Sequence, residues 1–149
     1  MPQLIEHHAW EPGPRPRVLV EAATWSVRQH LTTILERAGY DAASCPGPEG
    51  ASQRCNLAAG EGCSAAEGCD VVVHALASWD PRNLEALRAL RNRLPETPVV
   101  VETPAIVAAR LPDELEGCVV VPPPLRAGAL LDAVAEALGG AGSSEDDDG

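Results

Sequence analysis

Short apolar runs alternate with amphipathic segments along most of the chain. Runs rich in valine and other strand-forming residues predict strands over residues 17–22, 70–76, 98–103 and 118–121, with a weaker strand over 40–44. Apolar residues at helical spacing predict helices over 26–39, from Asp80-Pro81 through Leu94 and over 128–138, and a short, proline-interrupted helical segment over 105–115. Residues 45–69 are rich in Gly, Ala and Cys and predict only a short or irregular helix. This alternation is typical of a parallel α/β sheet.

Five such units predict a flavodoxin-like, doubly wound sheet of five parallel strands in the order 2-1-3-4-5, with helices on both faces. Residues 1–16 contain four prolines and predict a flexible, irregular arm. Residues 17–139 form the folded domain. Residues 140–149 are Gly, Ala, Ser and acid, and predict a disordered acidic tail. We expect neither end to contribute to the core.

The charge of the chain limits its partners. The sequence has 22 acidic and 11 basic residues, a net charge of −11, and its basic residues are all arginine. Such a surface repels phosphate backbones, so we expect no nucleic-acid partner. No apolar run is long enough to span a membrane, and no secretory signal is visible, so we expect a cytoplasmic protein whose five cysteines are reduced.

Several segments resemble the receiver domain of two-component response regulators. VRQHLTTILERAGYDAASC resembles the first helix and second strand of that domain, and DVVVHAL and PVVVET resemble its third and fourth strands. VVVPPPLRAGALL resembles its fifth strand and the start of its last helix. The resemblance covers residues 17–139 and implies a signalling role in a bacterial two-component pathway.

The chemical residues of a working receiver are missing. The resemblance assigns the two Mg²⁺-binding acids to Ala22 and Ala23, the phosphoacceptor to Ala75, and the phosphate-binding lysine to Pro123; only Thr103 is retained. Mg²⁺ requires oxygen ligands, and alanine offers neither a ligand nor a nucleophile. We therefore interpret the chain as a degenerate receiver, or pseudo-receiver, that is not an enzyme and for which no cofactor is expected and Mg²⁺ binding is unlikely.

One other interpretation of the pocket remains open. A register shift of one residue would bring Glu21 and His74 near the pocket and restore a phosphoacceptor, although neighbouring residues of a strand point to opposite faces. No nucleotide-binding loop, catalytic triad or H-E-x-x-H motif indicates another enzyme.

The expected function is protein binding without phosphorylation. The expected partner is another signalling protein or a second copy of this chain. We expect the contact on the face formed by the fourth helix, fifth strand and fifth helix, as receivers use it, with four contact residues: Trp79, Thr103, Leu125 and Arg126.

The alternative function is a thiol-based metal or redox sensor. Cys45, Cys55 and Cys63 lie in the Gly-rich segment and could together bind zinc or iron. None of them forms the C-x₂-C spacing of strong metal motifs. Cys69 and Cys118 begin strands, so we expect them at the opposite end of the sheet from Cys45.

Overall fold

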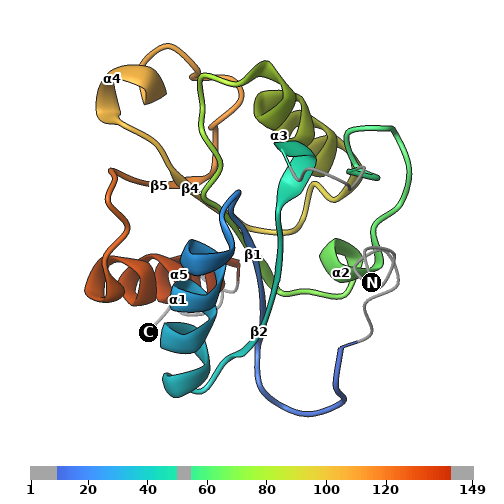
Figure 1. Ribbon diagram of the computed structural model, residues 1–149, viewed down its shortest axis with the longest axis vertical. Helices are drawn as coiled ribbons and strands as arrows, with labels where there is room; N and C mark the ends of the chain where they lie inside the picture. The colour runs from blue at the N-terminus through green and yellow to red at the C-terminus, as the bar shows by residue number, and fades with distance from the viewer. Residues whose placement is uncertain (1–9, 50–54, 142–149) are drawn as a thin grey trace, which may run out of the picture.

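The computed structural model describes residues 10–49 and 55–141 (Figure 1). The strands are β1 (Arg17–Glu21), β2 (Asp41–Cys45), β3 (Val71–His74), β4 (Val99–Glu102) and β5 (Val119–Val121). The helices are α1 (Trp25–Arg37), the 3₁₀ turn η2 (Gly47–Glu49), α2 (Ser64–Glu67), α3 (Pro81–Arg93), α4 (Ala105–Ala108) and α5 (Ala127–Ala141). None of the helices within these ranges is long and apolar enough to cross a membrane.

The five strands form one parallel sheet in the order β2-β1-β3-β4-β5. The predicted flavodoxin-like topology is therefore confirmed. Glu21 at the end of β1 stands beside Cys45 of β2 on one side and His74 of β3 on the other. The ends of these strands consequently lie at one edge of the sheet, which we call the carboxyl edge.

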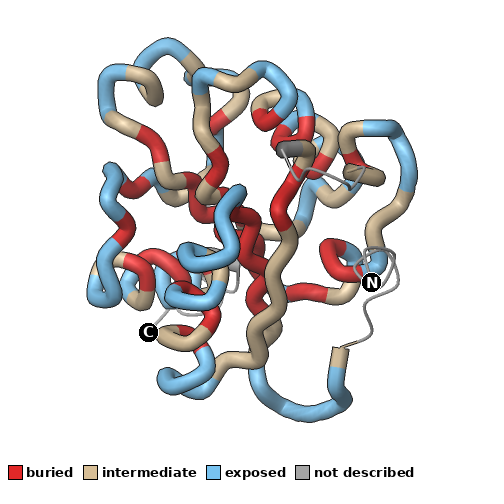
Figure 2. Tube along the Cα trace, viewed as in Figure 1, coloured by how far each residue is buried: buried red, intermediate tan, exposed pale blue. Residues whose placement is uncertain are grey.

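Two apolar layers enclose the sheet, and the buried stretches of the chain lie at the centre of the molecule (Figure 2). Val18, Val20, Val71 and Val73 pack under α1 and α5 in one layer. The alternating residues of the same strands, such as Leu19 and Val72, pack with residues of α2 and α3 in the other. Because valine strands are buried on both faces here, the sequence shows continuous apolar runs instead of alternation.

The ends of two helices follow the chemistry of their sequence. Asp80 precedes α3 and its Oδ1 accepts a hydrogen bond from the backbone N–H of Arg82 at 2.9 Å, while Pro81 occupies the first helical position. Gly39 follows α1 with a φ of 101°, a conformation that favours glycine. Helix α5 extends to Ala141 and so continues into the predicted tail; the rest of that tail, residues 142–149, lies outside the described residues.

The segment between β2 and β3 contains little regular structure. Only η2 and the four-residue helix α2 occur in its described part, and residues 50–54 lie outside the described residues. Helix α4 also has four residues and begins the segment 105–115, which was predicted as a short, proline-interrupted helical segment. Pro112 ends its apolar pattern, and the chain continues as turns.

The part of the N-terminal arm that is described, residues 10–16, contacts the domain through Trp10; residues 1–9 lie outside the described residues. The Trp10 indole N–H donates to the carbonyl oxygen of Ala65 at 3.0 Å. The ring lies against Gly68, where an added Cβ would come within 2.7 Å of Trp10 Cδ1, and it packs against the α2 and α3 layer. The expectation that the arm contributes nothing to the core is therefore wrong for Trp10.

Replacing Trp10 with alanine should destabilise the protein by about 2 kcal/mol, since the change removes a half-buried indole and one hydrogen bond. Urea unfolding followed by circular dichroism measures the change. Glu11→Ala is the matched control, because that neighbouring side chain is exposed. Equal stabilities of the two variants would show that the arm does not hold the domain.

Candidate functional site

A cavity of about 290 Å³ opens at the carboxyl edge of the sheet. Its apolar wall includes Ala22, Ala23, Val27, Ala75, Pro104 and Pro123. The Trp79 side chain, Thr24 and Ser78 complete the rim, and Glu102 supplies a carboxylate. The cavity lies between the ends of β1 and β3, where the chain leaves the sheet toward opposite sides. Open α/β sheets bind ligands at this switch point.

The structure brings together the four positions that the receiver resemblance assigned to reactive residues. Ala22 and Ala23 follow β1, Ala75 follows β3 and Pro123 follows β5, and all four line the cavity. Ala22 is 1% exposed. The methyl groups leave an apolar space where a working receiver holds its metal and phosphoryl group.

Thr103, the retained position, does not line the cavity. Its side chain is 2% exposed, and its Oγ1 lies 2.7 Å from Ser78 Oγ in a hydrogen bond between the two hydroxyls. The Thr103 N–H donates to the carbonyl oxygen of Val121 at 3.0 Å. Thr103 therefore ties β4 to β5 and to the loop after β3.

Glu102 is the site residue that sequence reasoning missed. It is half-buried in the cavity wall, and its Oε2 accepts the backbone N–H of Leu125 at 2.9 Å. Burial raises the pKa of this carboxyl, and the hydrogen bond from Leu125 acts in the opposite direction. The signal was present in the sequence: Glu102 is the one charged residue in the apolar strand PVVVET, and strand alternation places it on the same face as Val100.

Glu21 and His74 face away from the cavity. Both are buried, at 4% and 3% exposure, and His74 Nδ1 lies 2.7 Å from Glu21 Oε1. They lie on the α2 and α3 side of the sheet, as strand alternation requires for residues that precede Ala22 and Ala75. The pair therefore does not offer a phosphoacceptor to the cavity, and the register-shifted interpretation is wrong for this structure.

The four predicted contact residues divide into two kinds. Trp79 is 85% exposed and Arg126 is exposed, so both are available to a partner. Thr103 and Leu125 are 2% and 8% exposed. The prediction that these two contact a partner fails for their side chains, because Thr103 is held by Ser78 and Leu125 packs into the α1 and α5 layer.

The cysteines do not form a metal centre in the part of the chain that is described. No three His, Cys, Asp or Glu residues there are placed to hold a metal ion, and all five thiols are free. Burial, with Glu21 nearby, raises the pKa of Cys45 well above its ordinary range, and burial also raises the pKa of Cys55 and Cys63. Since the thiolate is the form that binds metals and reacts, these surroundings disfavour both uses.

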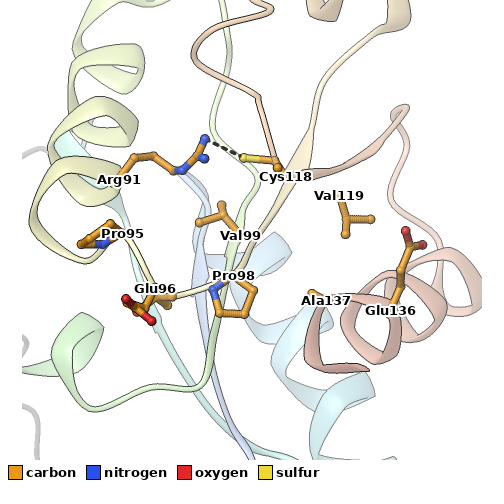
Figure 3. A pocket seen from close by; sticks show the side chains of 11 residues that line it. Arg91, Pro95, Glu96, Pro98, Val99, Cys118, Val119, Glu136 and Ala137 are labelled. Carbon is orange, nitrogen blue, oxygen red and sulfur yellow. Dashed lines mark hydrogen bonds between the residues drawn. The ribbon is translucent and has the colours of Figure 1, made fainter. Parts of the chain in front are cut away.

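A larger cavity, of about 460 Å³, lies at the opposite edge, where β4 and β5 begin (Figure 3). Cys118 and Arg91 stand on its wall, and Arg91 Nη1 donates to Cys118 Sγ at 3.1 Å and to the carbonyl oxygen of Glu114 at 2.6 Å. Arg91 also donates to the carbonyl oxygen of Glu116. The guanidinium therefore fixes the turn before β5 to α3, which is a structural role.

Comparison with known proteins gives a match at the level of structure. No protein-family model and no curated protein matches the sequence. The chemotaxis protein CheY4 of Vibrio cholerae aligns with a TM-score of 0.65 and 18% identity over 84% of this chain and 100% of CheY4.

Two receiver domains align comparably. A CheY-like receiver domain protein from Methanospirillum hungatei JF-1 has a TM-score of 0.67 and 16% identity, over 88% of this chain and 99% of its own. The receiver domain of the Francisella response regulator 1452 has a TM-score of 0.62 and 19% identity, over 83% and 97%. The chain therefore has the fold of the CheY-like receiver domains of response regulators.

Proposed function

We propose that this protein is a receiver-like signalling module that acts by binding another protein, without phosphoryl transfer, in a two-component-type pathway. One observation carries the proposal. In a receiver fold, the cavity at the carboxyl edge is lined by Ala22, Ala23, Ala75 and Pro123 where the reaction needs acids and a lysine.

The chemistry of phosphoryl transfer is unsupported at this cavity. Mg²⁺ takes six oxygen ligands in octahedral geometry and is held through charged carboxylates, yet Glu102 is the one carboxylate among the described lining residues. Transfer also needs a cation to stabilise the charge that develops on the phosphoryl oxygens. No lysine or arginine lines the described part of the cavity. The proposed module is accordingly not an enzyme.

Exposed apolar side chains around the cavity support protein binding. Trp79, Val27 and Ile106 are 85%, 42% and 69% exposed, and Trp25 at the start of α1 is 67% exposed. Trp79 and Val27 stand on the cavity rim itself. Exposed aromatic residues beside a concave apolar site are the usual anchors of protein interfaces. The rim of this cavity is the proposed contact surface, and the exposed Arg126 follows Leu125, whose N–H binds Glu102.

Incubation with acetyl phosphate and Mg²⁺ should leave the intact mass of the protein unchanged, because the cavity lacks the acceptor and the metal ligands. Intact-mass spectrometry measures the result. A phosphorylatable receiver domain treated in the same tube is the control for reagent activity. A stable, Mg²⁺-dependent gain of one phosphate would overturn the proposal, and peptide mapping would then test Glu102 as the acceptor.

A further inference from the structure

Building on the proposed function, we propose that the alanine-lined cavity receives a lysine or arginine side chain from a different protein. The aliphatic part of that side chain packs against the alanines, and its cationic end binds Glu102 in the cavity that Trp79 also lines. A working receiver domain has its own lysine beside an acidic site. In the proposed complex, the cation is instead a side chain of the partner protein.

The first argument is the charge of Glu102. Its carboxylate is half-buried in an apolar wall and accepts one backbone N–H, from Leu125. Among the described residues, no arginine forms an ion pair with it. Arg28 lies on α1, next in sequence to Val27 of the cavity wall. Its Nη1 donates instead to the carbonyl oxygens of Ala22 and Ala23, at 2.8 and 2.9 Å. A partly desolvated carboxylate with open acceptor sites binds a cation more strongly than an exposed one.

The second argument is the shape and lining of the cavity. Its volume of about 290 Å³ accommodates one long side chain, and the residues that line it with Glu102 are mostly alanine, valine, leucine and proline. Lysine and arginine combine an aliphatic stem with a charged end, so they match both parts of this wall. A purely apolar side chain would leave Glu102 buried without a counter-charge.

The third argument is the surroundings of the opening. Trp79 is 85% exposed on the rim, and an indole face attracts cations within about 6 Å of the ring centre. The whole chain carries a net charge of −11, which favours encounter with a basic protein over a second copy of itself. The charge, the shape and the rim of the cavity therefore favour a lysine or arginine side chain of a basic partner protein.

The probe is n-butylguanidinium, which carries the stem and head of an arginine side chain. Its titration into the ¹⁵N-labelled full chain should produce saturable shifts at the amides of Ala23, Ala75 and Leu125 and at the Trp79 indole N–H. Glu102→Gln should weaken binding at least about tenfold, because glutamine keeps an oxygen for the Leu125 N–H but loses the charge. Trp79→Ala should weaken it about twofold to fivefold.

Three controls make the test specific. Glu96→Gln, an exposed residue at the other cavity, changes the net charge equally and should leave binding unchanged. Butyrate, with a similar stem and a negative end, should not bind. If n-butanol bound as tightly as n-butylguanidinium, or if the Glu102→Gln variant bound the probe as tightly as the wild type, binding would not depend on charge and the inference would be overturned.

Self-association is the remaining alternative occupant. Sedimentation velocity of the unmodified protein should show a monomer; a dimer that Glu102→Gln dissociates would show that a second copy fills the cavity and would also overturn the inference. Failure here is distinguishable from failure of the proposed function, since the acetyl phosphate experiment is scored by mass and is independent of the probe.

Discussion

Replacing His74 with leucine should destabilise the protein by about 3 kcal/mol, because the change leaves the buried Glu21 carboxyl without its hydrogen-bond partner. Glu21 is 4% exposed and its Oε1 lies 2.7 Å from His74 Nδ1. Without the imidazole, the carboxylate would be buried in an apolar layer with its main partner absent. A loss of this size is a large share of the stability of a small domain, which is about 5 to 15 kcal/mol.

The double variant Glu21→Leu/His74→Leu distinguishes the energy of the Glu21–His74 contact from the energy of packing at these two positions. Replacing both partners with apolar residues is often neutral or stabilising, so the double variant should recover most of the stability that His74→Leu loses. Urea unfolding of the wild type, both single variants and the double variant measures the coupling. Losses that simply add would show that Glu21 and His74 contribute separately.

The position of this pair links stability to the site. Glu21 directly precedes Ala22, and His74 directly precedes Ala75, so the pair clamps β1 to β3 one residue before both strands reach the cavity. The Ala75 N–H also donates to the Glu21 carbonyl oxygen at 2.8 Å. The cavity wall is thus supported by this backbone hydrogen bond within the sheet and by the Glu21–His74 contact on the side of the sheet that faces away from the cavity.

The sheet order was predictable because four of the five strands are valine-rich runs and most of the intervening segments have helical spacing. In Val71–His74 and Val99–Glu102, burial on both faces and parallel pairing leave a clear pattern in the sequence. Helix lengths were harder to predict, as α4 shows, because four apolar residues at helical spacing do not fix where the chain turns.

The site was only partly predictable. The alanines of the cavity follow from chain position at the strand ends, but the role of Glu102 depends on which face of β4 it occupies and on the Leu125 N–H, which is 23 residues away. Trp10 is similar: its partner Ala65 is 55 residues distant, and no local pattern indicates the contact. Thr103 and Leu125 were predicted at a contact surface, but both are buried. Their burial depends on which other elements pack against them, and the local sequence does not show this.

The last prediction concerns alkaline pH, where this chain is unusually simple. It has no lysine and one tyrosine, so its thiols are the main groups that titrate above pH 9. Burial, with Glu21 and Asp70 nearby, raises the pKa of Cys69 from 9.0 to about 12. Burial also raises the pKa of Cys118, against the opposing effect of Arg91. Each thiol therefore holds its proton more tightly when folded than when unfolded.

A group whose folded pKa is raised stabilises the native state fully below its unfolded pKa and loses that contribution as pH rises toward the folded value. Stability from Cys69 should be intact at pH 8 and lower by about 2.5 kcal/mol at pH 11. Cys69→Ala removes this ionisation and keeps every other titratable group, so urea unfolding under reductant should show a shallower loss between pH 9 and 11 for the variant than for the wild type. Parallel losses would show that the Cys69 thiol ionises as readily in the folded protein as in the unfolded chain, contrary to its place beneath the α2 and α3 layer.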